Sequence, residues 1–201
     1  RSLQRDQALS DEPLLAYELS GEPLTAHQGR PLRLLVPGWY GAPNVKFLSE
    51  IHVQKDQYLG KFQANWYRTL KGEMVNGEMK WKETAISTMR LKSFIARVTG
   101  TDSGHNIFGV IMHDGTPINS VEVKVDDGPW QSATLDPETA REKYGWKFFN
   151  YTWTGANPGE HTVTSRATDA NGVVQPTAEE LEVKQTFLEH NAQLPRTVII
   201  A

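Results

Sequence analysis

The sequence predicts a mainly β protein whose larger part, residues 85–201, is an antiparallel sandwich. Short stretches in which apolar and polar residues alternate recur after residue 85, and turn signals such as Asp-Asp-Gly and Asn-Gly separate them. Large aromatic residues follow the same stretches, and each can bury about 150–250 Å² between two sheets. The aromatic residues expected to contribute to this core are Trp130, Trp146, Phe148, Tyr151 and Trp153.

A chain of 201 residues can form two small domains, each with its own core. The pattern changes near residue 85, so we expect a first domain over residues 1–84 and the sandwich over 85–201. The hydrophobic fraction of 38% and the charged fraction of 22% are ordinary for a globular protein.

The first domain is expected to begin with short strands. LLAYEL (14–19) leads into a turn at Ser20-Gly21, and LRLLV (32–36) is ended by Pro37-Gly38. FLSEIHV (47–53) alternates apolar and polar residues and predicts a half-buried strand. Residues 60–82 lack a clear period, so we expect a connecting segment that lies across a surface, with a tight turn at Asn76-Gly77.

The clearest strands of the sandwich are expected at three places in the second domain. They are VEVKV (121–125) before Asp-Asp-Gly, HTVTSRA (161–167) before Asp-Ala-Asn-Gly, and TVII (197–200).

Composition excludes several function classes. The net charge of −3, with acids and bases interleaved, offers no basic face for nucleic acid. No apolar run approaches the roughly 20 residues of a membrane-spanning helix. Without cysteine there is no disulfide, thiolate metal ligand or cysteine nucleophile, and no histidine pair has the spacing of a metal site. We therefore expect no metal ligand within these residues.

Two cations flank the Pro-Gly turn and could bind an anion. One interpretation of Arg33 and Lys46 is a pair of solvated surface cations without a binding role. The other is a binding site for an anion or a cofactor, since a guanidinium can bind phosphate or the edge of a pterin. For Tyr67, a packed aromatic ring with a wet hydroxyl and a site residue are both open.

The runs LLAYELSGEPL, PLRLLVPGWYGAPNVKFL and FQANWYR resemble the C-terminal part of the molybdenum cofactor domain of the sulfite oxidase family. VEVKVDDGPW, GWKFFNYTW, GEHTVTSRATDANGVVQP and NAQLPRTVII resemble the immunoglobulin-like (E-set) dimerisation domain that follows it. The resemblance implies a partial α+β segment of the cofactor-domain fold before the sandwich, and Mo-molybdopterin as the cofactor of the parent enzyme. Because the chain opens at Arg1 without a methionine, we expect it to belong to a longer protein.

The resemblance also implies roles for individual residues. In that family the arginine of the PLR motif and the triplet after the turn contact molybdopterin, which carries over to Arg33 and to Asn44, Val45 and Lys46. The position before Gly29, often a histidine that touches the cofactor, is Gln28 here, and the neighbouring His27 is the alternative.

The family's active-site tyrosine corresponds to Tyr67. The cysteine that ligates molybdenum in the family is absent, so we expect this chain alone to be inactive. In the region where sulfite-oxidising members have an anion-binding arginine, Lys184 is the nearest cation, which puts sulfite itself in question.

The resemblance further implies a homodimer formed through the sandwich, a cytochrome or other electron acceptor, a small sulfur-containing anion as substrate, and a periplasmic location. The alternative is a non-catalytic immunoglobulin-like binding or interaction module, because such sandwiches serve many functions.

Overall fold

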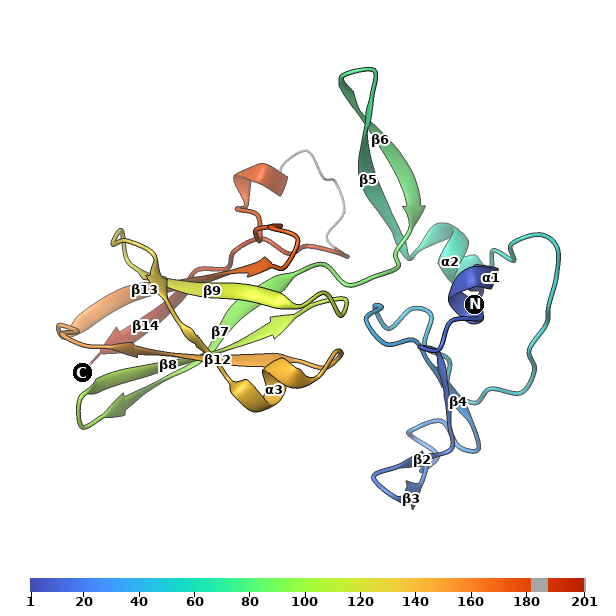
Figure 1. Ribbon diagram of the computed structural model, residues 1–201, viewed down its shortest axis with the longest axis horizontal. Coiled ribbons are helices and arrows are strands. Elements are labelled where there is room, and N and C mark those ends of the chain that lie inside the picture. Colours follow the sequence, from blue (N-terminus) through green and yellow to red (C-terminus); the bar gives the residue numbers. More distant parts are fainter. Residues whose placement is uncertain (182–187, 201) are drawn as a thin grey trace. The chain divides into compact units, whose positions relative to one another are not determined.

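The computed structural model describes residues 1–181 and 188–200, which form two compact units (Figure 1). Residues 1–88 and 188–189 belong to the first unit, and residues 89–181 and 190–200 belong to the second. Each unit is described by itself. No helix in these two ranges is long and apolar enough to cross a membrane.

The second unit consists of two four-stranded antiparallel sheets, ordered β11-β12-β8-β7 and β10-β9-β13-β14. Its strands are β7 (Lys92–Thr101), β8 (Gly104–Met112), β9 (Ile118–Val125), β10 (Gln131–Ser132), β11 (Thr134–Leu135), β12 (Lys147–Trp153), β13 (Gly159–Asp169) and β14 (Arg196–Ile200). A short helix, α3 (Pro137–Arg141), begins after Asp136, whose carboxylate accepts from the backbone N–H groups of Glu138 and Thr139, and η1 (Glu179–Leu181) is a single 3₁₀ turn. The mainly β prediction and the three predicted strands are confirmed.

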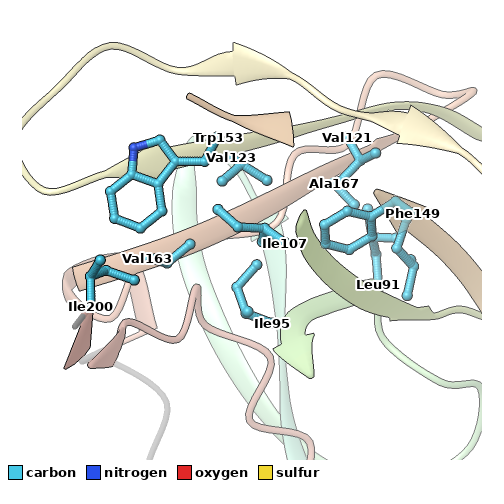
Figure 2. Close-up of a cluster of buried hydrophobic side chains, with 11 residues drawn as sticks. Leu91, Ile95, Ile107, Val121, Val123, Phe149, Trp153, Val163, Ala167 and Ile200 are labelled. Carbon is cyan, nitrogen blue, oxygen red and sulfur yellow. The ribbon is translucent and has the colours of Figure 1, made fainter. Parts of the chain in front are cut away.

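The apolar core of this unit lies between the two sheets (Figure 2). Ile107 and Phe149 come from one sheet, and Val121 and Val163 come from the other; all four are almost fully buried. Phe149 pairs with Gly109 across β12 and β8. A Cβ at Gly109 would lie 2.0 Å from Cζ of Phe149, so the ring occupies the space that a side chain would need.

The aromatic residues divide between the core and the outer faces. Trp153 is buried in the core, whereas Trp146 is 58% exposed, so the expectation for Trp146 is wrong. Successive side chains of β12 point to opposite faces of the sheet, so Phe149 faces the core and Phe148 faces the other way. The ring centroids of Phe148 and Phe108 are 5.5 Å apart. Trp130 is covered by the guanidinium of Arg166, 4.3 Å from its centroid.

Gln175 organises a buried polar cluster in the second unit. Its Oε1 accepts from the N–H and the hydroxyl of Ser93, at 2.9 and 2.6 Å. Its Nε2 donates to the carbonyls of Ser93 and Ala192, each at 3.1 Å, and the Ser93 hydroxyl also meets that of Ser165 at 3.0 Å. The amide therefore satisfies its hydrogen-bonding capacity while only 1% exposed.

Strands β7 and β14 are the outer strands of their two sheets, and a hollow of about 370 Å³ is lined by residues of both. The guanidinium of Arg196 connects them, because its Nη1 donates to the carbonyls of Ile95 and Ala96 at 2.9 and 2.6 Å. The ladder of β7 shifts register at this position, between Ile95 and Arg97.

The first unit has short elements and small sheets. They are α1 (Arg5–Ala8), β1 (Leu14–Ala16), β2 (Glu18–Leu19), β3 (Glu22–Pro23), β4 (Arg33–Leu35), α2 (Lys61–Asn65), β5 (Arg68–Val75) and β6 (Glu78–Ala85). The pairs are β1 with β4, β2 with β3, and β5 with β6, all antiparallel. The predicted turn at Ser20-Gly21 joins β2 to β3, with φ of 55° and 83°.

Two predictions for the first unit are wrong. Residues 47–53 form no strand; φ of 55° at Phe47 breaks the extended backbone, and Val53 is 99% exposed. Residues 60–82, expected as a connecting segment, instead hold α2 and most of the β5–β6 hairpin. The tight turn at Asn76-Gly77 is confirmed, and positive φ at both residues is typical of a type I′ turn.

Candidate functional site

The turn after β4 is shaped by the side chain of Asn44. Its Oδ1 accepts from the N–H of Val36 at 2.7 Å, and its Nδ2 donates to the carbonyl of Tyr40 at 3.3 Å. Val45 then exchanges two backbone hydrogen bonds with Leu34 of β4, at 2.8 and 3.1 Å. Asn44 and Val45 thus fix the path of the chain that leads to Lys46.

Arg33 and Lys46 converge on two consecutive residues. Nη1 of Arg33 donates to the carbonyl of Gln28 at 3.0 Å, and Nζ of Lys46 donates to the carbonyl of His27 at 2.6 Å. Gly29 makes this approach possible, since a Cβ there would lie only 2.7 Å from Cβ of Lys46. Its φ of 102° also suits glycine best.

This cluster has the chemistry of an anion site. Nε of Arg33 is buried and has no hydrogen-bond partner. Over the described ranges, no carboxylate forms a salt bridge with Arg33 or Lys46, so both positive charges remain available to a ligand. A buried donor without a partner, together with a second positive charge at the neighbouring carbonyl, fits an anionic group with several acceptor oxygens, such as a phosphate.

Gln28, which precedes Gly29, and its neighbour His27 are the two candidates for one cofactor contact, and their side chains differ in their hydrogen bonds. The Gln28 amide oxygen accepts from the N–H of Thr25 at 2.8 Å, so it stabilises its own turn. The side chain of His27 is exposed and has no hydrogen bond within residues 1–181 and 188–200. The structure therefore commits Gln28 locally and leaves the imidazole of His27 available.

Tyr67 follows α2 and lines a small hollow in the same unit. Its N–H donates to the carbonyl of Phe62 at 2.8 Å, and its carbonyl accepts from Ile86 at 2.9 Å, so its backbone is fixed on both sides. Trp39 and Pro43, from the turn after β4, line the same hollow. Arg33 and Lys46 are not among the residues that line this hollow.

Sequence reasoning missed Arg1 in this hollow. Its guanidinium lies 5.2 Å from the ring centroids of both Phe62 and Tyr67, and its Nε donates to the carbonyl of Ala42 at 2.8 Å. No motif marks Arg1, because its contacts join residues about 40 to 65 positions apart in the chain. Lys184, the cation named from the sequence, lies outside the described residues.

Two histidines of the second unit have shifted pKa values with opposite signs. Burial, and then the nearby charge of Lys147, lower the pKa of His113 below its usual value. A hydrogen bond to the Asp126 carboxylate, with Nδ1 and Oδ2 2.8 Å apart, raises the pKa of His161. In the parts of the chain that the structure describes, no three His, Asp or Glu side chains group as a metal site.

Comparison with known proteins relates the sequence of this chain to a family. Residues 1–62 match the family described as "Oxidoreductase molybdopterin binding domain". Mitochondrial sulfite oxidase of Drosophila melanogaster is 32% identical over 184 residues, which cover 81% of this chain and 31% of that protein. The chain belongs to the sulfite oxidase family. Mo-molybdopterin is the cofactor that this membership indicates for the parent enzyme.

Further relatives agree with this assignment. Human mitochondrial sulfite oxidase is 29% identical over 179 residues, which cover 82% of this chain and 32% of that protein. Inducible nitrate reductase [NADH] 2 of Glycine max is 30% identical over 164 residues, covering 72% and 18% respectively. The chain thus spans about a third or less of the length of these family members.

A solved structure shows the same fold. The sulfane dehydrogenase SoxCD from Paracoccus pantotrophus superposes with a TM-score of 0.77 at 24% identity. The superposition covers 96% of this chain and 50% of that chain.

Proposed function

We propose that the chain is the C-terminal portion of a sulfite-oxidase-like molybdenum oxidoreductase, which acts on a small sulfur-containing anion by oxygen-atom or two-electron transfer. The observation that carries the proposal is the convergence of Arg33 and Lys46 on the carbonyls of Gln28 and His27, within the region that matches the molybdopterin family. A binding module would have no evident use for a buried guanidinium nitrogen without a partner.

In this proposal the first unit holds one side of the cofactor. Arg33 donates from Nε to an acceptor of the pterin or its phosphate, and Lys46 adds a positive charge beside it. The backbone at Asn44 and Val45 is held by its own hydrogen bonds and presents a fixed surface. His27 contributes a donor or an acceptor, since its side chain is exposed. The bound molybdenum cofactor supplies the redox and oxygen-transfer chemistry.

Tyr67 acts on the substrate side of the proposed site. Its hydroxyl has no hydrogen bond in the described part of the chain, so it is available to donate to a substrate oxygen. The backbone contacts to Phe62 and Ile86 hold the ring in place, which favours a role in orientation and proton transfer.

In this proposal, these 201 residues alone do not convert substrate. They contain no cysteine, so a thiolate ligand for molybdenum has to come from other residues. We further propose that the sandwich is an immunoglobulin-like domain and forms the interface of a homodimer. The parent enzyme would pass its electrons to a cytochrome or a similar acceptor and would be located in the periplasm. Their support is the family membership and the fold shared with sulfane dehydrogenase SoxCD.

Cofactor content of the full-length protein tests the proposal. Arg33→Ala and Lys46→Ala together should lower molybdenum and pterin per polypeptide by about tenfold or more, because two charge-assisted contacts are lost. Lys55→Ala is the matched control, since Lys55 is an exposed cation with no hydrogen bond within the described ranges. Full cofactor occupancy in the double variant would contradict the proposed site, and wild-type protein that never contains molybdopterin would favour the binding module.

The choice between His27 and Gln28 has its own measurement. His27→Ala should lower pterin retention during gel filtration more than Gln28→Ala does, because the Gln28 side chain is committed to Thr25. The reverse order would assign the contact to Gln28.

A further inference from the structure

The β5–β6 hairpin of the first unit carries a group of sulfur and aromatic side chains on one face. The two strands form a two-stranded sheet of their own (Figure 1). Gly72 lies directly opposite Trp81, and Met74 lies directly opposite Met79. Residues that are paired across a ladder, or two positions apart in one strand, lie on the same face. Gly72, Met74, Met79 and Trp81 therefore share one face, and we call them the thioether cluster.

The side chains of the thioether cluster are open to solvent. Met74 is 64% exposed, Met79 is 52% exposed and Trp81 is 42% exposed. The chain has four methionines, and these two are the only pair that faces each other across a ladder in the described residues. Both thioethers are thus accessible to a ligand from solution.

The sulfur of Met79 and the indole of Trp81 meet above Gly72. A Cβ at Gly72 would lie 2.6 Å from Sδ of Met79 and 3.3 Å from Cη2 and Cζ3 of Trp81. The missing side chain leaves a space that the sulfur and the six-membered ring share. Cβ atoms of directly opposite residues are about 4.5–5.5 Å apart, so the flexible side chain of Met74 can bring its sulfur to that of Met79.

Within residues 68–85 the carboxylates are directed elsewhere. Glu73 and Glu78 lie on the opposite face of the hairpin, by the alternation of the two strands. Glu83 lies on the same face as the cluster, but its Oε1 accepts from Nε of Arg68 at 3.1 Å. The cluster therefore offers uncharged sulfur ligands rather than the oxygen ligands that Mg²⁺ and Ca²⁺ prefer.

These ligands suit a soft monovalent cation. Thioether sulfurs select Cu(I) among the biological metal ions, and the face of an indole ring attracts a cation placed over it. None of the cation–π contacts made by the described residues uses Trp81, so its ring face is open to a metal ion.

We propose that Met74, Met79 and Trp81 form a binding site for one Cu(I) ion. The two sulfurs coordinate the ion, and the indole ring covers one side of it. Binding changes no oxidation state and releases no proton, because a thioether carries none. The site shares no residue with the proposed cofactor site, so this inference does not depend on the proposed function.

Titration of the full-length protein with Ag(I) in chloride-free buffer tests the inference, because Ag(I) has the charge and softness of Cu(I) and is stable in air. With ¹³C-methyl methionine, the signals of Met74 and Met79 should shift and saturate together, whereas those of Met89 and Met112 should not. The loss of each signal in Met74→Leu and Met79→Leu assigns it. This readout resolves the site from other soft ligands of the full-length protein.

The same two variants measure the contribution of each sulfur. Each should raise the Kd for Ag(I), followed on the remaining methionine of the pair, by about tenfold or more, since leucine keeps the apolar volume but removes the ligand. Trp81→Phe should raise it by about threefold, because a phenyl ring attracts a cation less strongly. Met89→Leu is the matched control and should change it by less than about twofold.

Two further measurements separate metal binding from an apolar surface. The Kd should be the same at about pH 5 and about pH 8, whereas binding through a histidine would weaken as the pH falls through about 6.5. Hydrogen exchange in β5 and β6 shows that each variant keeps its hairpin. An unchanged Kd in both leucine variants would overturn the inference, as would Ag(I) saturation without a shift of the Met74 and Met79 signals.

Discussion

The two units differ in how much of their stability their own residues provide. The second unit buries a cluster of eleven hydrophobic side chains between two sheets. In the described part of the first unit, the buried hydrophobic side chains are Leu24, Val36 and Ile86, while others stay exposed, among them Leu14 at 51%, Trp66 at 63% and Ile51 at 68%. Since apolar burial is the main favourable term of folding, the second unit has more stabilisation from its own side chains than the described part of the first.

The polar groups show the same contrast. In the second unit the buried amide of Gln175 satisfies its donors and acceptor internally. In the first unit the buried Nε of Arg33 has no partner, and the donors of Arg1 and Lys46 face carbonyls rather than carboxylates. Unsatisfied charge is costly in a structural core and useful in a binding site.

The largest expected effect tests the core of the second unit. Gly109→Ala would place a Cβ 2.0 Å from the Phe149 ring, so the ring must leave its site and the unit should lose about 3 kcal/mol or more. Hydrogen exchange measured on peptides from β8 and β12 should accelerate strongly. Gly100→Ala is the control on the neighbouring strand, where nothing lies within 4 Å, and equal exchange in both variants would contradict the packing.

A smaller effect is expected from the polar cluster. Gln175→Ala removes the partners of buried groups on Ser93 and Ala192 and should cost about 2–3 kcal/mol in urea unfolding. Gln131→Ala, at an exposed position in β10, should be within about 0.5 kcal/mol of wild type. Were the two variants equally stable, the buried amide would have no net structural value.

The two shifted histidines should give opposite dependence on pH. The lowered pKa of His113 means that the unfolded chain takes up its proton first, so this contribution to stability is complete above about pH 6.5 and is lost as the pH falls. The raised pKa of His161 means that its contribution is complete below about pH 6.5 and is lost as the pH rises through the folded value.

Urea unfolding between pH 5 and pH 8 measures both terms. His113→Gln should destabilise the protein more at pH 8 than at pH 5, and His161→Gln should do the reverse. Parallel pH profiles for the two variants would refute the assignment.

The smallest effect concerns the hairpin of the first unit. Gly77 has φ of 82° in the β5–β6 turn, and Gly77→Ala should cost about 1 kcal/mol locally. Hydrogen exchange should rise in β5 and β6 while the sandwich is unchanged. Gly72→Ala tests the same hairpin at a position within β5. A Cβ there would lie 2.6 Å from Sδ of Met79, whose flexible side chain can move aside.

Sequence patterns predicted the second unit well because local and tertiary preferences agree there. VEVKV and HTVTSRA alternate with the period of the sheets in which they lie, and their inward residues Val121, Val123 and Val163 form the core. The same alternation failed at residues 47–53, because no neighbouring strand pairs with them among the described residues. Alternation shows that a segment is compatible with a half-buried strand. Whether the strand forms depends on a pairing partner elsewhere in the chain.

The candidate site was predictable only in part. The PLR motif and the triplet marked Arg33 and Lys46, and the structure brings both onto the loop at His27 and Gln28. Arg1 carried no local signal, because its place beside Tyr67 results from bonds between Ser2 and Gln63. A residue positioned by contacts about 60 residues away cannot be found from spacing alone.

The hydrogen bonds of Arg196 have a consequence for how copies of this protein meet. By occupying the carbonyls of Ile95 and Ala96, its side chain removes acceptors that an incoming foreign strand would need to extend the sheet along β7. A charged side chain bound to these carbonyls disfavours pairing of β7 with a strand of another molecule. In the same strand as Arg196, β14, the side chain of Ile199 is 80% exposed. Replacing Arg196 with a neutral residue is therefore expected to increase strand-to-strand association along β7.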